Sequence, residues 1–226
     1  MDDKKNKIDI VIVTPKGKNL WARCEKLEYD VFLQAGYIEP NPEKRIVDYD
    51  SYKEVEILAA LWGTKNQSNK DKTLTGVYRY ITGLRKDKMD FGIFPTIDAY
   101  KKLGISEDKM EMLMKLNPKK VVDTSSMAIG EEYRDYVSSN LLWMRMFTRA
   151  WELGIRYGVA AIDTSFFLKL KKRFPCEEMG PPKMYWGSYT TPTFIDSYKF
   201  AKGIKRLGVY GYRVKGLIKK YTQLIY

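Results

Sequence analysis

The apolar positions begin with a strand-like run and continue as a helical stripe. Residues 8–13 (IDIVIV) are a β-branched run that predicts a strand. Over residues 19–35, apolar side chains recur at helical spacing and stop at Gly36, so we expect a helix with one buried face. Residues 36–52 are rich in proline and polar side chains and predict a long loop, which is often functional inside a compact domain.

The middle of the chain alternates strand-like and helical patterns. Residues 54–63 and 73–83 predict two strands joined by an extended polar hairpin loop. Residues 89–95 (MDFGIFP) are expected to add a strand or a sheet edge. A short helical pattern follows at 107–116, and residues 119–130 predict the next strand.

The longest predicted helix covers residues 138–157, where apolar side chains recur every three or four positions. Residues 158–163 predict a buried strand, 164–173 a short helix and 183–189 (KMYWGSY) a further strand. The middle hairpin is antiparallel, whereas the later strand–helix–strand units need right-handed crossovers. The order therefore predicts an α/β (α+β) fold with a mixed central sheet and helices on both faces.

The composition is that of a folded protein. With 226 residues, of which 44% are apolar, the chain can bury a sizeable core. We expect one domain over residues 1–196 and a basic, aromatic-containing extension over 197–226. No run approaches roughly 18 consecutive apolar residues and the first residues do not resemble a signal peptide, so we expect a cytoplasmic protein.

The chain contains no histidine. This excludes His-activated serine or cysteine nucleophiles, imidazole bases and His-ligated zinc. Cys24 and Cys176 lack the C-x-x-C spacing and are expected to be reduced thiols, neither of them the candidate nucleophile. We predict no metal site, and the proton acceptor must be Asp, Glu, Tyr, Lys, a terminus or water.

The formal net charge is +12. Eight basic residues and no acid lie in residues 197–226: Lys199, Lys202, Lys205, Arg206, Arg213, Lys215, Lys219 and Lys220. Such a segment attracts an acidic protein, an anionic membrane surface or nucleic acid. Aromatic residues alternate with these lysines, so peripheral contact with the inner membrane face stays open. Nucleic acid is disfavoured, since no zinc site, RNP-like sequence or helix-turn-helix is found.

The junction between the predicted strand at 119–130 and the long helix can hold an anion. If the helix begins near residues 136–138, its first N–H groups are unpaired and can receive a phosphate, with Arg134 supplying full charge. Alternatively, Ser138 and Ser139 cap the helix and Arg134 pairs with Glu131 or Glu132.

The same stretch resembles the phosphate-binding turn of a known superfamily. SMAIGEEYRDYVSSNLL, followed by GVAAID, is similar to the strand, Arg/Gln-x-x-Gly-x-Gly/Ala turn and helix of the GNAT acyltransferases. Arg134 stands at the Arg/Gln position, while Val137 and Ser139 take the places of the glycines. The resemblance implies a GNAT-like fold in which this turn holds the phosphates of an acyl donor.

Two segments are similar to one branch, the acyl-homoserine-lactone autoinducer synthases and N-acyl amino acid synthases. LEYDVFLQAGY resembles Leu-Arg-x-x-Val-Phe-x-x-x-x-Gly-Trp, with one residue fewer before the glycine, Phe32 in place, Tyr37 at the tryptophan position and Glu28 replacing the arginine. VDYDSY resembles the acidic Asp-x-x-Asp segment of the branch, through Asp48 and Asp50, which stand one residue closer together.

Later strands extend the resemblance in the same order, over residues 20–196. LTGVYRYITG matches a Gly-x-x-Arg strand, with Arg79 at the arginine. VVDTSSMAI aligns with Glu-x-Ser-Arg-x-Ala-Val/Ile, with Asp123 at the glutamate and Ser126 at the arginine. GPPKMYWGSYTTPTFID fits the late strand that shapes the acyl pocket in this branch.

The resemblance implies an N-acyltransferase that acts on a small amine acceptor such as an amino acid. The donor would be the phosphopantetheine thioester of acyl carrier protein, or acyl-CoA; loss of the turn glycines favours the carrier, which has one phosphate. The basic segment would then steer this acidic carrier. Autoinducer synthesis from S-adenosylmethionine is an alternative, disfavoured by the arginines lost at Glu28 and Ser126. A second alternative is a non-catalytic module that senses acyl groups or binds membrane or nucleic acid.

Aminolysis of a thioester suits a histidine-free chain, because positioning supplies much of the rate and no covalent nucleophile is needed. Asp123, Asp48 or Asp50 would accept the amine proton, or each merely pairs with Arg79 or a lysine. Arg79 either orients an acceptor carboxylate or locks the 36–53 loop onto the sheet.

The remaining predicted site residues divide by substrate. Phe32 and Tyr37 join Arg79 on the acceptor side. The donor side comprises Met127, Ile129, Arg134, Ser138, Ser139 and Trp143. Seven aromatic residues either line a tunnel for an acyl chain or belong to the ordinary core: Trp143, Phe147, Trp151, Phe166, Phe167, Tyr185 and Trp186.

Overall fold

A computed structural model describes residues 7–52, 54–82, 94–134, 136–172, 176–197 and 199. The chain forms two compact units, one of Met1–Thr82 with Thr124–Met146 and one of Gly83–Asp123 with Phe147–Tyr226. The strand order is β1-β2-β3-β4-β5-β8-β6, with β7 paired to β8. Both antiparallel and parallel pairs occur, which confirms the predicted mixed α/β sheet.

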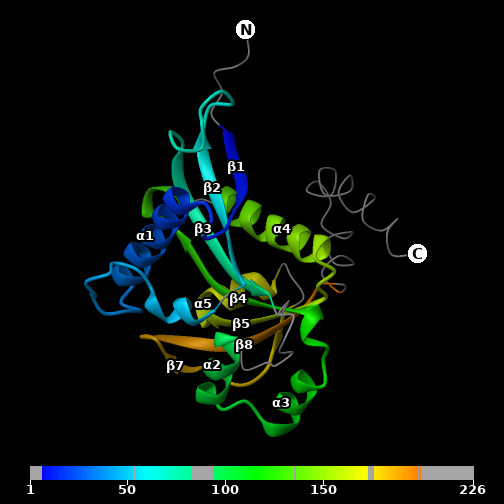
Figure 1. The fold of residues 1–226 in the computed structure, drawn as a ribbon. Helices are drawn as coiled ribbons and strands as arrows, with labels where there is room; N and C mark the ends of the chain where they lie inside the picture. The colour runs from blue at the N-terminus through cyan, green and yellow to red at the C-terminus, as the bar shows by residue number, and fades with distance from the viewer. Residues whose placement is uncertain are drawn as a thin grey trace. The chain divides into compact units, whose positions relative to one another are not determined.

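The first unit is built on an antiparallel meander. β1 (Lys7–Val13), β2 (Val55–Gly63) and β3 (Thr73–Thr82) run side by side in Figure 1, with Ile57 of β2 opposite both Val13 and Arg79. These strands confirm the predicted runs, because β-branched and aromatic side chains pack well on a pleated, buried surface.

Helix α1 (Lys18–Gln34) follows β1 and confirms the predicted helix. It ends where Gly36 adopts a φ of 73°, a left-handed conformation that glycine reaches without strain. The predicted loop after it includes a short 3-10 helix, η1 (Val47–Ser51).

Strand β4 (Val121–Ile129) contributes to both units. Val121–Asp123 lie in the second unit and pair in parallel with β5 (Tyr157–Asp163). Thr124–Ile129 lie in the first unit. Just after the strand, the Gly130 amide donates to the Thr75 carbonyl of β3 at 3.0 Å. A 3-10 turn, η4 (Glu131–Tyr133), then leads into α4 (Tyr136–Glu152).

Helix α4 is shorter than the predicted 138–157. It begins within the expected window but stops at Glu152, because Gly154 has a φ of 66° and breaks the helical path. The apolar residues just after it belong to the turn into β5 rather than to the helix.

The second unit contains the C-terminal strands. β5 (Tyr157–Asp163) pairs antiparallel with β8 (Ser188–Asp196), which also pairs with β6 (Cys176–Glu178). α5 (Thr164–Lys171) confirms the predicted short helix, and the Asp163 side chain caps it by accepting from the Ser165 and Phe166 amides.

Helix α2 (Pro95–Leu103) was not predicted. Residues 89–93 of the strand expected at 89–95 lie outside the described part of the chain. Its last residue, Pro95, starts a helix instead. The signals are proline in its first turn and Gly104 after its end, with a φ of 68°. The predicted helix at 107–116 is confirmed as α3 (Glu107–Met114).

The single strand predicted at 183–189 is wrong. β7 (Lys183–Tyr185) and β8 form a hairpin in which Tyr185 faces Ser188 across a two-residue loop. Trp186 and Gly187 have φ values of 46° and 69°, as a type I′ turn requires at both central positions. A tryptophan is rare there, so the sequence read as continuous strand.

Two predictions concern the ends of the chain. The extension beyond residue 196 lies outside the described residues apart from Ser197 and Lys199, so its boundary stays a prediction. Among the helices that the structure describes, none combines the length and apolar character needed to cross a bilayer.

Candidate functional site

Side chains of β3 point alternately to the two faces of the sheet in the first unit. Arg79 points to the α1 face, where it meets Glu28. A Cβ built on Gly76 would lie 3.2 Å from Leu142 of α4, and the Tyr78 ring packs edge-on against Trp143 of α4 at 5.4 Å. Helices α1 and α4 therefore cover opposite faces of the strands, as residues two apart share a face.

A buried ion pair lies at the centre of the α1 face. The Arg79 Nε lies 3.1 and 3.0 Å from the two carboxylate oxygens of Glu28, and its Nη2 lies 2.6 Å from Oε2. Arg79 is 1% and Glu28 0% exposed. The Ser126 hydroxyl of β4 donates to the same carboxylate. Burial opposes the charge of Arg79, but Glu28 outweighs it and raises the pKa of the guanidinium.

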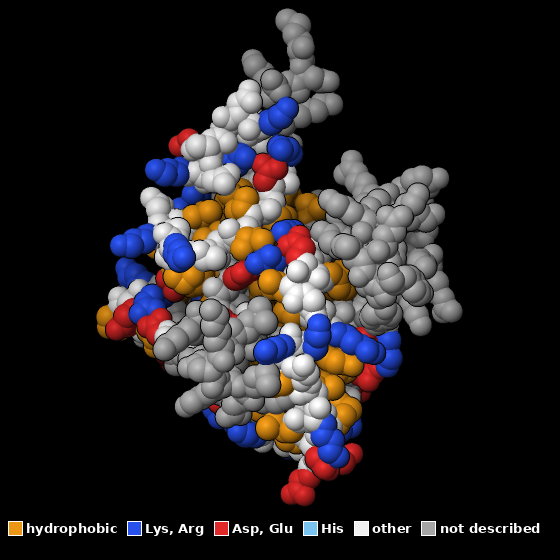
Figure 2. All heavy atoms as spheres, turned by 45° about the vertical axis from the view of Figure 1, so that its right-hand side comes forward, with side chains coloured by type: hydrophobic (Ala, Val, Ile, Leu, Met, Phe, Trp, Pro, Cys, Tyr) orange, Lys and Arg blue, Asp and Glu red, His pale blue; other side chains and the backbone are white. Residues whose placement is uncertain are grey.

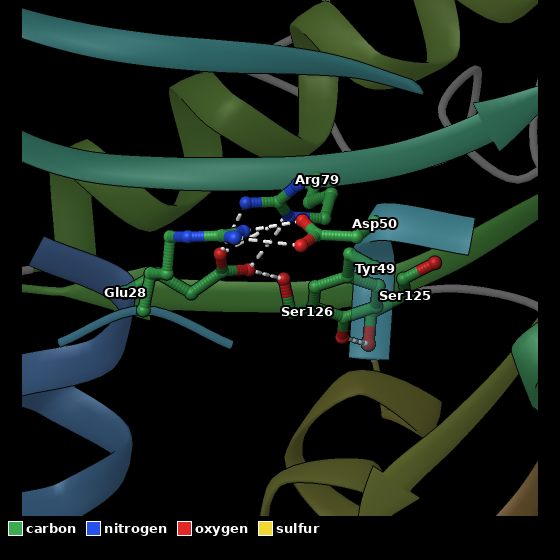
Figure 3. A network of polar contacts seen from close by, with 7 residues as sticks. Glu28, Tyr49, Asp50, Arg79, Ser125 and Ser126 are labelled. Atoms are coloured by element: carbon green, nitrogen blue, oxygen red, sulfur yellow. Dashed lines mark hydrogen bonds and ion pairs between the residues drawn. The ribbon is translucent and has the colours of Figure 1, made fainter. Parts of the chain in front are cut away.

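Aromatic rings enclose this pair. The Arg79 Cζ lies 4.5 Å from the ring centre of Tyr49 and 5.3 Å from that of Trp21. The Tyr49 hydroxyl reaches the Ser125 carbonyl at 3.4 Å, so η1 is tied to β4 as well as to β3. Figure 3 shows Glu28, Tyr49, Arg79 and Ser126 converging from α1, η1, β3 and β4.

A second ion pair lies beside the first on η1. The Arg45 Nη2 lies 2.6 Å from the Asp50 Oδ2 in a bidentate contact, and these hydrogen bonds lower the pKa of Asp50. Asp48, also a predicted proton acceptor, is exposed on the same turn. On α1, Glu25 is half-buried, and burial raises the pKa of its carboxyl.

Phe32 and Tyr37, predicted on the acceptor side, contact each other. Their rings pack edge to face with centres 5.7 Å apart. The Tyr37 amide donates to the Phe32 carbonyl at 2.9 Å, which closes the end of α1 around Gly36. The pair thus fixes the start of the loop that carries η1.

Asp123, the third predicted proton acceptor, lies in the second unit, on the part of β4 that pairs with β5. It is fully buried, and its two oxygens accept from the Thr96 amide at 2.8 Å and the Thr96 hydroxyl at 2.6 Å. Asp123 therefore holds the first turn of α2. This contact leaves its predicted catalytic role untested.

The predicted donor residues gather on the α4 face. Ile129 approaches Gly76 and Met127 shares its strand face, while Trp143 packs on Tyr78. Ser138 is buried in the first turn of α4, and Ser139 is half-buried.

Arg134 is exposed at the junction, where its Nη2 lies 3.5 Å from the Gln34 Oε1. The Gln34 amide in turn donates to Glu131 at 2.6 Å. Gln34 thus links Arg134 to one of the two glutamates that the sequence offered as direct partners.

Neither cysteine is suited to act as a nucleophile. Cys24 and Cys176 are buried, and burial raises the pKa of each thiol to about 12. Among the described residues, no group of three or more Cys, Asp or Glu side chains is placed to hold a metal ion.

The predicted tunnel aromatics occupy mixed environments. Trp143, Phe147 and Phe167 are at most 3% exposed, whereas Tyr185 and Trp186 stack at 5.6 Å beside the β7–β8 turn. The burial of Trp143, Phe147 and Phe167 fits both predicted roles, lining an acyl tunnel and filling the ordinary core.

The basic segment lies outside the described residues except for Lys199, which pairs with Glu177. On the face in Figure 2, Lys and Arg side chains are interspersed with Asp and Glu over the described residues.

The residues around the Arg79–Glu28 pair form what we call the Arg79 cluster: Trp21, Glu25, Glu28, Arg45, Tyr49, Asp50, Arg79 and Ser126. Four of them were not predicted from the sequence: Trp21, Glu25, Arg45 and Tyr49. A signal for two of them was present. Trp21, Glu25, Glu28 and Phe32 recur at helical spacing and share one face of α1. Tyr49 and Arg45 had no such signal, because an irregular loop carries them.

No protein-family model matches the sequence, and neither does any curated protein. Solved structures do match. The CoA-dependent acyl-homoserine lactone synthase BjaI, solved with SAM and isopentyl-CoA, matches at a TM-score of 0.60 and 16% identity, over 89% of this chain and 90% of that one.

FeeM, an N-acyl amino acid synthase from uncultured soil microbes, matches at 0.56 and 11%, over 88% and 96%. The AHL synthase LasI matches at 0.60 and 15%, over 88% and 94%. The chain therefore has the fold that acyl-homoserine lactone synthases and an N-acyl amino acid synthase share, as the motif resemblance predicted.

Proposed function

We propose that this protein is an N-acyltransferase that moves an acyl group from a thioester to the amino group of a small acceptor. One observation carries the proposal: nearly the whole chain has the fold of BjaI, LasI and FeeM, all of which are named as synthases of N-acylated products. Fold alone does not define activity, so the residues of the site must also suit the chemistry.

The chemistry balances without a covalent enzyme intermediate. The neutral amine nitrogen attacks the thioester carbonyl carbon, the C–N bond forms, the C–S bond breaks and the thiol leaves. One amine proton passes to a carboxylate or water and finally to the thiolate. A chain with no histidine and two buried thiols of pKa about 12 suits this direct transfer.

The two substrates are assigned to the two faces of the first unit. The donor arm follows the α4 face along Met127 and Ile129, with its phosphate near Arg134 and the start of α4. The acceptor occupies the α1 face beside η1, near Arg79, with Asp48 or Asp50 accepting its proton. Strand β4 contributes side chains to both substrate sites, because its alternate residues point to opposite faces.

The donor is either acyl carrier protein or CoA. BjaI is described as CoA-dependent, which supports a nucleotide thioester. The net charge of +12, concentrated toward residues 197–226, supports an acidic carrier protein instead.

The test supplies purified full-length protein with long-chain acyl carrier protein or with acyl-CoA of matched chain length. The acceptor pool contains amines, amino acids and S-adenosylmethionine. We expect release of free thiol together with an N-acyl product, identified by mass spectrometry. A heat-denatured sample controls for spontaneous aminolysis, and absence of product with both donors at several chain lengths would favour a non-catalytic acyl-binding module.

A further inference from the structure

Arg79 has little capacity left for an external anion. Its Nε and Nη2 edge is bonded to Glu28, the rings of Trp21 and Tyr49 pack on the guanidinium, and only 1% of the residue is exposed. A substrate carboxylate would have to displace Glu28, which is itself fully buried. That exchange would leave a second carboxylate without its partner in the core, at high cost.

The charge around Arg79 is already balanced toward the negative. Glu25, Glu28 and Asp50 supply three carboxylates, against the two guanidinium groups of Arg45 and Arg79. Asp50 and Arg45 satisfy each other in a bidentate contact. A ligand carboxylate would therefore add a fourth negative group. A ligand ammonium group, such as the second amine of a diamine, would instead be attracted by the net negative charge.

Glu28 is the carboxylate that neutralises Arg79 in this group of charges. It replaces a basic residue in the motif that α1 otherwise resembles, and it receives both the Arg79 edge and the Ser126 hydroxyl. Glu28 and Ser126, which stand at the two motif positions where the arginines are lost, thus bond directly to each other, although they are 98 positions apart in the sequence.

We infer, on the basis of the acyl transfer proposed above, that the acceptor is an amine without a carboxylate group, and that Glu28 determines this specificity by occupying Arg79. The substrate class is a simple amine or a diamine rather than an amino acid. Glu28 acts as a specificity and positioning residue, because its carboxylate contacts Arg79 and not the reacting atoms.

The first experiment uses the wild-type protein and acceptor pairs that differ only in the carboxylate: phenylalanine and 2-phenylethylamine, leucine and isopentylamine, ornithine and putrescine. With the active donor, kcat/KM should be about tenfold or more higher for the decarboxylated member of each pair, the scale of one hydrogen bond to a charged group. Equal or better use of the amino acids overturns the inference.

Variants then test the role of Glu28. Glu28→Gln keeps the shape of the side chain but removes the negative charge that neutralises Arg79. Arg79 can then attract the carboxylate of an amino acid, so the preference for amines should fall by about tenfold. In the double variant Glu28→Gln with Arg79→Gln no cation is released, so the wild-type preference should persist. Asp30→Asn, an exposed carboxylate on the same helix, should leave the preference unchanged. An unaltered preference in a folded Glu28→Gln protein contradicts the role of Glu28.

Calorimetric binding of each acceptor in the absence of donor separates the two proposals. Amine binding tighter than that of its amino acid, without turnover, would reject acyl transfer and support the carboxylate-free ligand. Turnover that favours amino acids would uphold acyl transfer and overturn the acceptor class. Binding of neither member of any pair overturns both.

Discussion

Among single residues, Arg79 is a buried cation held by hydrogen bonds to Glu28 and by the rings of Trp21 and Tyr49. Its pair with Glu28 is fully buried, and such a pair is a weak source of net stability but costly to break. Removing one partner costs about 3–5 kcal/mol, whereas replacing both by neutral groups of similar size can be nearly neutral. Substitution of either partner alone should therefore destabilise the first unit more than substitution of both.

Asp123 gives a prediction at this scale. Asp123→Asn replaces the charged acceptor of the Thr96 amide and hydroxyl by a neutral amide, which weakens both hydrogen bonds, so the free energy of unfolding should fall by about 1–3 kcal/mol, measured by urea denaturation. The control is Asp98→Asn in α2, the helix that carries Thr96; the Asp98 carboxylate is 57% exposed and pairs with Lys101, so its effect should stay below about 0.5 kcal/mol. Equal effects of the two substitutions would show that Asp123 does not hold α2.

Among the elements, β4 is the strand whose side chains reach both faces of the first unit. Its buried residues Thr124, Ser126 and Ala128 alternate with the half-buried Ser125, Met127 and Ile129. Ser126 reaches the α1 face and Ile129 the α4 face. Pairing with β5 covers only Val121–Asp123, after which β4 continues within the first unit.

The β7–β8 hairpin gives the element-scale prediction. Gly187 has a φ of 69°, where a Cβ is strained, so Gly187→Ala should lower the free energy of unfolding by about 1 kcal/mol or more. Gly180→Ala is the matched control in the same unit. A Cβ there would meet Ile105 at an ordinary 3.4 Å, and thermal denaturation should shift little. If Gly187→Ala is equally mild, the turn is not type I′.

At the scale of the whole molecule, charge is distributed unevenly along the chain. The net +12 includes eight basic residues and no acid in residues 197–226. Long-range steering depends on such a field and is screened by salt, over a length of about 10 Å at 0.1 M ionic strength.

This charge leads to a prediction about association. Replacing the seven basic residues of 202–220 with glutamine should slow binding to acidic acyl carrier protein at low salt and reduce the salt dependence of the rate, measured by stopped-flow fluorescence. A variant with Lys16, Lys65 and Lys70 replaced controls for lost charge elsewhere on exposed loops. A rate that stays the same in the first variant would exclude the segment as a steering surface.

The sequence alone predicted the elements whose pattern is local. β1, β2, β3, α1, β5 and α5 were found because hydrophobic periodicity and end signals such as Gly36 depend on residues a few positions away. The ordered series of motifs also led to the correct fold. α2 and the β7–β8 turn were missed because nine residues carry little periodicity and a tryptophan does not mark a turn.

Only the tertiary structure decided which side chains meet. Arg79 was predicted at the site, but that Glu28 neutralises it and Ser126 joins them follows from packing α1 against β3 and β4. Asp123 was grouped with Asp48 and Asp50 as a proton acceptor, yet it accepts hydrogen bonds from Thr96 of α2. The physical reason is range: periodicity acts within one element, whereas the partner of a buried charge depends on which elements pack together, and no local pattern encodes that.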